Sequence, residues 1–155
     1  MDDVTIRRAT AADLPAIVRL LADDPLGRTR EHYAEPLPAA YGEAFAAIEA
    51  QEGNRILVAV ADGRVVGCLQ LTFIPGLTRL GMTRAQIEGV RVASGRRGEG
   101  IGERLLAHAV EASREARCGL VQLTTDASRG DAHRFYERFG FVASHVGMKL
   151  ALTPR

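Results

Sequence analysis

The residues with the clearest chemical potential lie in a short basic turn that is rich in glycine. From Arg96 to Gly102 the chain reads Arg-Arg-Gly-Glu-Gly-Ile-Gly, after a stretch of strand character and before apolar residues at helical spacing. The first turn of a helix has about four backbone N–H groups without intrahelical partners, and the helix dipole adds partial positive charge there. Glycines let an anion approach this backbone, and the arginines add full charge. The turn therefore predicts a phosphate-binding site.

The pattern of the turn decides which phosphate compound is expected. The chain lacks the G-x-x-x-x-G-K-[ST] pattern of P-loops, and its glycines do not follow the G-x-G-x-x-G pattern of dinucleotide-binding folds. The turn instead resembles the (Q/R)-x-x-G-x-(G/A) loop of the GNAT acetyltransferase superfamily. This resemblance implies that the loop holds the pyrophosphate of acetyl-coenzyme A (acetyl-CoA), which would be a co-substrate. The matching residues are Arg97, Gly98, Glu99, Gly100, Ile101 and Gly102.

A second motif resembles another signature of the same superfamily. Residues 132–141 match A-x-x-(F/Y)-Y-x-x-x-G-F, which implies that Tyr136 lies near the sulfur of the coenzyme. A phenol within reach can give a proton or a hydrogen bond to the departing thiolate. The alternative is a core aromatic, but Phe135 and Phe139 share one helix face and Tyr136 is rotated off it, which favours the catalytic role. Arg129 stands where we expect the family's asparagine, so one contact to the pantetheine arm differs and Arg129 could instead reach a phosphate.

The resemblance also implies how the thioester is held. The pantetheine amides would pair like an additional strand with the chain at Val90, Arg91 and Val92, where this strand splays away from the strand at 120–125. A backbone N–H near Val90 would donate to the thioester carbonyl and stabilise the oxyanion, and such a donor typically contributes about 2.7–4 kcal/mol. The acetyl group would pass directly to an amine within a ternary complex.

The amine acceptor must lose a proton before it attacks, so a base is needed. Glu88 lies on the strand that leads to the glycine-rich turn and is the candidate, acting directly or through water. An ion pair with Arg84, Arg91 or a neighbouring arginine is an equally good interpretation of this carboxylate. His133 and His145 are weaker candidates, because a single histidine on a strand or a charged helix is more often structural or solvated.

Periodicity and turn residues predict the elements that position these groups. Their order indicates an α/β (α+β) fold: a mixed, mainly antiparallel sheet with helices on both faces, in three layers. A right-handed strand–helix–strand unit at 86–125 forms its parallel part, and Asp62-Gly63 predicts a tight hairpin. This order also matches the GNAT fold, so the resemblance covers essentially the whole chain. We expect strands at 4–8, 56–61, 64–74, 85–92, 120–125 and 141–150, and helices at 10–22, 38–51, 101–117 and 131–139.

Length and composition limit the classes of protein. The 155 residues predict a single domain spanning 1–155, and a hydrophobic content of 46% is ordinary for a globular protein. A net charge of +1 and the lack of a basic stripe argue against a nucleic-acid partner, and no apolar run approaches a membrane span. Cys68 and Cys118 lack metal-like spacing and are interpreted as buried thiols. We therefore expect a cytoplasmic protein with no metal.

Three functions are open at this point. The leading hypothesis is an enzyme, an acetyl-CoA-dependent N-acetyltransferase that acts on the primary amine of a small molecule. Its acceptor site would be closed by segments 23–38 and 75–83. A protein or peptide N-acetyltransferase would need an open groove instead. A non-catalytic acyl-CoA-binding regulatory module is the third, and the presence of Tyr136 and Glu88 argues mildly against it. A homodimer is open as well, since many members of the superfamily dimerise but no exposed apolar strand demands it here.

Overall fold

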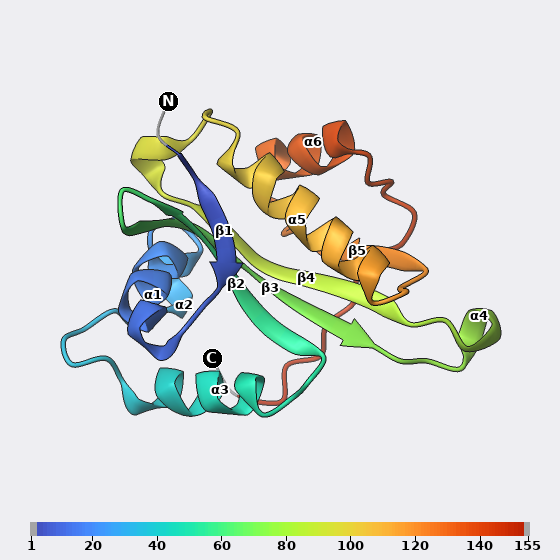
Figure 1. Ribbon diagram of the computed structural model, residues 1–155, viewed down its shortest axis with the longest axis horizontal. Helices are drawn as coiled ribbons and strands as arrows, with labels where there is room; N and C mark the ends of the chain where they lie inside the picture. Colours follow the sequence, from blue (N-terminus) through green and yellow to red (C-terminus); the bar gives the residue numbers. More distant parts are fainter. Residues whose placement is uncertain (1–2, 154–155) are drawn as a thin grey trace. The chain divides into compact units, whose positions relative to one another are not determined.

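A computed structural model describes residues 3–153, and the chain divides into two units after Gln122. In the first unit, helices pack against a twisted sheet (Figure 1). The second unit contains the helix α6 (Gly130–Phe139). The other elements are β1 (Thr5–Arg8), α1 (Leu14–Ala22), α2 (Gly27–Arg30), α3 (Ala39–Glu49), β2 (Asn54–Ala61), β3 (Arg64–Ile74), α4 (Thr78–Gly81), β4 (Arg84–Val92), α5 (Ile101–Glu115) and β5 (Leu120–Leu123), with 3-10 turns at Ala11–Asp13 and Ser94–Arg96.

The sheet has five strands in the order β1-β2-β3-β4-β5. The first three pairs of neighbours are antiparallel. Beside β4, the N–H of Gly119 donates to the carbonyl of Thr83 at 2.9 Å, and the side chain of Gln122 donates to that of Gln86 at 2.7 Å. In both contacts the residue at β5 follows its partner at β4 by the same number of residues. The two strands therefore run in the same direction, as a parallel pair requires. The expected mixed, mainly antiparallel sheet is therefore confirmed.

The hairpin between β2 and β3 is also confirmed. Asp62 and Gly63 form its two-residue turn, with φ angles of 49° and 71°, and Ala61 is paired with Arg64. Two positive φ angles in succession define the primed turn whose twist matches that of the strands.

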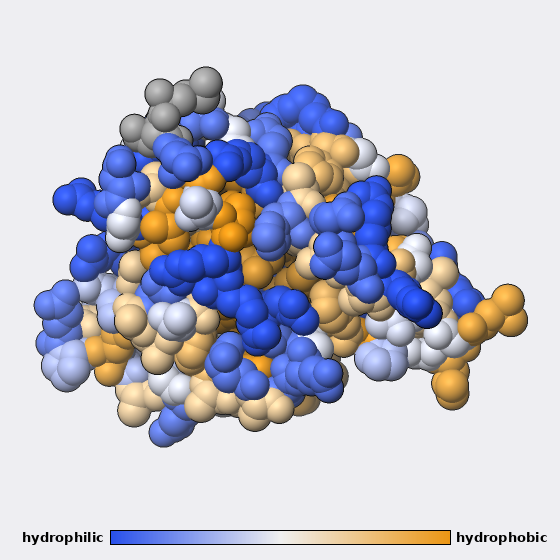
Figure 2. Space-filling model, viewed as in Figure 1, coloured by the Kyte–Doolittle hydropathy of each residue, from blue (hydrophilic) through white to orange (hydrophobic). Residues whose placement is uncertain are grey.

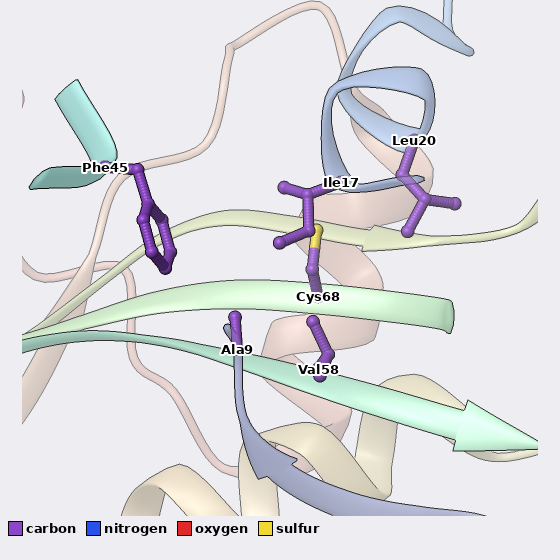
Figure 3. Close-up of a cluster of buried hydrophobic side chains, with 6 residues drawn as sticks. All are labelled: Ala9, Ile17, Leu20, Phe45, Val58 and Cys68. Atoms are coloured by element: carbon purple, nitrogen blue, oxygen red, sulfur yellow. The ribbon is translucent and has the colours of Figure 1, made fainter. Parts of the chain in front are cut away.

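Successive residues of β3 face opposite sides of the sheet. In the first unit each side is covered by a helix, so a helix, the sheet and a second helix form layers. Cys68 lies among apolar side chains on the face covered by α1, and Figure 3 shows it directed toward Ile17. Gly67 lies on the opposite face, against Ile101 and Leu105 of α5. The expected three layers are thus present in this unit. The first cluster contains Ala9, Ile17, Leu20, Phe45, Val58 and Cys68.

The loop between β3 and β4 ends in an apolar tip. It contains the four-residue element α4, in which Arg79 and Leu80 have left-handed φ angles of 54° and 61°, so residues 76–83 form a turn and not a regular helix. Leu77 and Leu80 at this tip are almost fully exposed, and Figure 2 shows the tip as an orange projection at the right. None of the helices within residues 3–153 has both the length and the apolar character that a membrane span requires.

The predicted strand at 141–150 is wrong for the described chain, because residues 141–153 contain no strand. Alternating apolar residues show which side of a strand would be buried, but a strand also needs a neighbour for its N–H and C=O groups. The other differences are at boundaries. Helix α5 ends at Glu115, β5 ends at Leu123, and the connection at 23–38 contains α2.

An ion pair holds the start of the first helical segment. Arg7 donates two hydrogen bonds to the carboxylate of Asp13, at 2.7 and 2.9 Å, and the N–H of Thr10 donates a third at 2.8 Å. Chiefly because of the hydrogen bonds from Arg7, the pKa of Asp13 is lowered from 3.8 to about 2. The folded state therefore favours the ionised carboxylate.

This shift predicts a defined loss of stability in acid. A lowered folded-state pKa stabilises the fold above the unfolded-state value of 3.8, and the contribution is lost as the pH falls from 3.8 through about 2. Asp13→Asn should lower the free energy of unfolding by about 1–2 kcal/mol at pH 7 and flatten its dependence on pH below 4. Urea unfolding at several pH values measures both effects. The control is Asp62→Asn in the exposed hairpin turn, which should change neither the free energy of unfolding nor its dependence on pH. If Asp13→Asn left the dependence on pH below 4 unaltered, the assignment would be contradicted.

Candidate active site

Strand β4 carries a bulge shortly before the glycine-rich turn. Between the pairs Cys68–Arg91 and Gln70–Glu88, β3 has one residue and β4 has two, Gly89 and Val90. Gly89 has a φ of 61°, the left-handed conformation that the first residue of a glycine bulge adopts. The extra residue bends the strand and takes Val90 out of the regular ladder. A glycine inside a predicted strand, here Gly89 within 85–92, is the sequence signal of such a bulge.

The second half of β4 also runs beyond its contact with β5. In the first unit that contact reaches Gln86, which lies beside Gln122. The residues from Glu88 to Val92 continue past this point, and beyond them lies the turn. The bulge lies directly before Arg91 and Val92, which still pair with β3. The pairing of Val90 to Val92 with an extended ligand stays a prediction.

The glycine-rich turn leads into α5 through two residues with left-handed backbone. Gly98 has a φ of 82° and Gly100 a φ of 79°, conformations that side-chain-bearing residues rarely adopt. Gly100 is the N-cap residue, and no side chain caps the helix. The first-turn N–H groups of α5 therefore lack both intrahelical and side-chain acceptors. A Cβ on Gly98 would meet no atom within 4 Å, so the space above the turn is open.

The charged side chains around the turn have different partners. Arg96 forms an ion pair with Glu99 at 2.6 Å, which offsets the one carboxylate within the turn. Arg97 is exposed and makes no ion pair with any described residue. An anion that approaches the start of α5 would therefore meet the helix dipole and the guanidinium of Arg97.

Arg91 is anchored on the opposite side. Its Nε lies 2.9 Å from Oδ2 of Asp24, and both side chains are largely buried, at 18% and 11% exposure. A second nitrogen of Arg91 donates to the carbonyl of Val90 at 2.9 Å. Oδ1 of Asp24 accepts from the N–H of Gly27 at 2.5 Å. The side chain of Arg91 thus ties the end of β4 to the α1–α2 connection, and only its backbone is available for the expected ligand pairing.

Glu88 is exposed on β4, next to the bulge. The two arginines considered as its ion-pair partners are engaged elsewhere: Arg84 donates to Gln122 at 3.4 Å, and Arg91 pairs with Asp24. The structure therefore does not support the ion-pair interpretation, and the carboxylate faces solvent at the point where β4 leaves β5.

The buried thiol at the bulge is a structural group. Cys68 lies 3.7 Å from the carbonyl oxygen of Gly89, to which its thiol donates. Burial raises the pKa of the Cys68 thiol to about 12, so it is uncharged at neutral pH. Desolvation also raises the pKa of the half-buried Cys118. Neither thiol is activated as a nucleophile.

In the second unit, Tyr136 lies among aromatic rings. Its ring makes edge contacts with Phe135 and Phe141, with centroids 5.3 and 5.9 Å apart. The chain turns back at Gly140 and brings Phe141 against the ring, a contact that the helix-face argument did not include. The catalytic role of Tyr136 stays a prediction. The N–H of Phe141 donates to the carbonyl of Tyr136 at 3.0 Å. The tyrosine is only half-buried.

Arg129 is the N-cap residue of α6. Its backbone N–H donates to the carbonyl of Asp126 at 2.9 Å, and its carbonyl accepts from the N–H of His133 at 3.1 Å. His133 itself lies 3.1 Å from Glu137, one helical turn further along. The first unit thus brings together Glu88, Val90–Val92 and residues 97–102, while Tyr136 and Arg129 belong to the second unit.

The chain has an α/β fold. At the start of α5, next to the bulged strand β4, its backbone N–H groups form a candidate anion site. The sequence matches the model of the acetyltransferase (GNAT) family over residues 15–141. The chain therefore belongs to the GNAT acetyltransferase family, whose members are acyltransferases.

Individual relatives agree with this assignment. An aminoalkylphosphonate N-acetyltransferase of Salmonella typhimurium is 32% identical over 147 residues, which cover 95% of this chain and 90% of that protein. A glucosamine 6-phosphate N-acetyltransferase of Trypanosoma brucei brucei is 39% identical over 90 residues, covering 58% and 59%. A crystal structure described as a transcriptional regulator from Bacillus halodurans C-125 is 51% identical, with a TM-score of 0.95 over 97% of this chain and 100% of that one.

The Asp24–Arg91 pair predicts a measurable coupling. Removing one charge of a largely buried pair leaves the other uncompensated, so Asp24→Asn and Arg91→Met should each lower the free energy of unfolding by about 2–4 kcal/mol. The double variant should lose clearly less than the sum, because it leaves no unpaired charge. Asp24→Asn keeps an oxygen for the N–H of Gly27. The same cycle on the exposed pair Glu111–Arg114 of α5 is the control and should show almost no coupling; additive losses at Asp24 and Arg91 would refute the anchor.

Proposed function

We propose that this protein transfers the acetyl group of acetyl-CoA to the primary amine of a small molecule by direct attack in a ternary complex, with the whole chain acting as one domain. The observation that carries the proposal is the start of α5. Its uncapped N–H groups, its left-handed glycines and the unpaired Arg97 suit a diphosphate. The bulged end of β4, directly before the turn, supplies backbone for the pantetheine arm.

The residues of the chain would divide the chemistry as follows. Residues 97–102 would bind the diphosphate, and the backbone of Val90 to Val92 would orient the pantetheine. The N–H of Val90 would donate to the thioester oxygen as negative charge develops there. Glu88 would accept the proton of the amine, directly or through water, as the nitrogen bonds to the acyl carbon. When the C–S bond breaks, the hydroxyl of Tyr136 would donate to the thiolate. Arg129 is the candidate for a further coenzyme contact.

Charge in the segment at 23–38 favours an acceptor that carries an anionic group. Two of its acids are engaged: Asp24 pairs with Arg91, and Glu35 accepts from Tyr33 at 2.7 Å. Arg28 is exposed and has no acidic partner among the described residues. A polycationic acceptor would need unpaired acids here. Two of the related N-acetyltransferases are named for amines that bear a phosphonate or a phosphate, and the same class of acceptor suits this chain.

A matched panel of amines tests the proposed reaction. Free thiol released from acetyl-CoA should appear with aminomethylphosphonate or glucosamine 6-phosphate, and kcat/KM should be at least about tenfold lower with methylamine or glucosamine, which lack the anionic group. Arg28→Gln should reduce this ratio without changing the rate on the neutral amines. Equal rates on charged and neutral amines would contradict the acceptor class.

The second candidate function is an acyl-CoA-binding regulatory module. The observation that favours it is the description of the Bacillus halodurans protein as a transcriptional regulator. Binding of acetyl-CoA without release of thiol in the presence of any amine would support this candidate and overturn the catalytic proposal.

A charge placed in the first turn of α5 tests the binding site itself. Acetyl-CoA at about one hundred times its Kd should stabilise the fold by about 2.7 kcal/mol, which is seen as a rise in Tm. Gly102→Glu should abolish that rise because the carboxylate repels a diphosphate. A glutamate in the first turn of a helix favours folding, so the variant should remain folded. Gly102→Gln, of the same size and uncharged, is the control and should keep most of the rise; equal rises in both variants would place the coenzyme elsewhere.

A further inference from the structure

Four polar side chains form a row across the face of the sheet that α1 covers. Cys68 lies on this face, and Gln70 and Thr72 follow it at every second position of β3, so they share the face. Asn54 of β2 is paired with Thr72, and Glu88 of β4 is paired with Gln70. Because paired residues direct their side chains to the same side, the row runs from Asn54 through Thr72 and Gln70 to Glu88.

The buried end of this row holds Gln70 in one orientation. Asn54 is only 8% exposed, and its Oδ1 accepts from Nε2 of Gln70 at 3.0 Å and from the hydroxyl of Thr72 at 3.2 Å. Nδ2 of Asn54 donates to Gln51 at 3.2 Å, so it is the oxygen of Asn54 that faces Gln70. The amide nitrogen of Gln70 is therefore directed toward β2.

The carbonyl oxygen of Gln70 is open to a ligand. Nitrogen and oxygen lie on opposite sides of an amide carbon, so this oxygen is turned away from β2, toward the side of β4 and Glu88. It accepts no hydrogen bond from a residue within 3–153. The buried side-chain atoms that lack a hydrogen bond in this range are Nε of Arg55 and Nε of Arg91, so solvent reaches the oxygen of Gln70.

Glu88 ends the row on β4 and is exposed, without an ion pair to a described residue. The Cβ atoms of a cross-strand pair lie about 4.5–5.5 Å apart, so one nitrogen of a ligand can contact the oxygen of Gln70 and the carboxylate of Glu88 together. Val90, whose N–H is proposed to bind the thioester oxygen, follows two residues later, within roughly 7 Å along the strand. A nitrogen held by Gln70 and Glu88 therefore lies beside the expected position of the acyl carbon.

We propose that Gln70 binds the nitrogen of the acceptor amine and that Asn54 positions Gln70 for this contact. The inference rests on the proposed acetyl transfer, to which it adds a residue outside both sequence motifs. A primary ammonium has three N–H bonds. It loses one proton to Glu88, which frees the electron pair that attacks the acyl carbon, and a second proton as the C–S bond breaks and the thiolate leaves. The third N–H stays on the product amide, and it donates to the oxygen of Gln70 throughout.

Gln70→Met tests the contact, because methionine has a similar length and no amide oxygen. In the full chain, kcat/KM for aminomethylphosphonate should fall at least about tenfold, as expected when a hydrogen bond to a charged group is lost, while KM for acetyl-CoA stays within about twofold of the wild-type value. The loss should be the same factor for methylamine, since the contact is made at the nitrogen and not at the anionic group.

Thr72→Val is the matched control. It removes the other hydrogen bond to Oδ1 of Asn54, two residues away on the same face, and should leave kcat/KM for both amines within about twofold of wild type. Unchanged kcat/KM in Gln70→Met, or an equal loss in Thr72→Val, would overturn the role of Gln70 and leave the proposed acetyl transfer standing. A wild-type protein that released no thiol with any amine would overturn the acetyl transfer, and the role of Gln70 with it.

A double-mutant cycle tests the positioning role of Asn54. Asn54→Leu should lower kcat/KM for methylamine by about the same factor as Gln70→Met, and the double variant should lose no more than either single variant, because Asn54 acts only through Gln70. Asn54→Asp keeps an oxygen for Gln70 and should stay within about threefold of wild type. Losses that multiply in the double variant, or an Asn54→Asp variant as inactive as Asn54→Leu, would contradict the positioning role.

Discussion

The position of the candidate site depends on the close approach of α5 to β3 at Gly67. A Cβ at Gly67 would lie 3.0 Å from Cδ1 of Leu105, 3.1 Å from the carbonyl oxygen of Arg91 and 3.2 Å from Cγ2 of Ile101. These atoms belong to the helix that begins at the glycine-rich turn and to the strand that ends at it. A side chain at Gly67 would therefore push the start of α5 and the end of β4 apart, so the glycine allows the candidate anion site to lie close to the strand that precedes it.

The net charge around the glycine-rich turn depends on three arginines that have different partners. Arg91 is held by Asp24, and Arg96 is held by Glu99, so their charges are offset by neighbouring carboxylates. Arg97 is exposed without such a partner. The chain as a whole has a net charge of only +1, and yet the start of α5 combines the positive end of the helix dipole with the exposed Arg97 a few residues before it, which favours a local positive field.

The sequence predicted the parts of this arrangement that depend on neighbouring residues. The glycine-rich turn, the hairpin at Asp62-Gly63 and the strand–helix–strand unit are local patterns, and the structure contains all three. The partner of Arg91 could not be predicted from the sequence, because Asp24 is distant along the chain and lies in a connection without periodicity. The surroundings of Tyr136 were missed for a similar reason: Phe141 reaches its ring only after the chain reverses at Gly140.

The predicted strand at 141–150 shows a different limit. Alternation specifies which face of a strand is apolar, but the pairing that makes a strand is a property of two segments. The residues from Val146 to Leu152 alternate correctly and remain unpaired in the single chain. A correct reading of the periodicity therefore gave a wrong secondary structure, because the missing information was the neighbour and not the pattern.

Irregular backbone is concentrated where the proposed chemistry lies. Three of the six glycines with positive φ in the described chain, Gly89, Gly98 and Gly100, lie between the middle of β4 and the start of α5. A bulge weakens a ladder, and a glycine N-cap leaves free the N–H groups that a serine or aspartate side chain would satisfy, at a cost of only a few tenths of a kcal/mol. The flanking packing is close: Ile87, Ile101 and Leu105 are almost fully buried. A poorly satisfied backbone held in place by a tightly packed core is what a preorganised ligand site requires, since its free N–H groups are already oriented before the anion arrives.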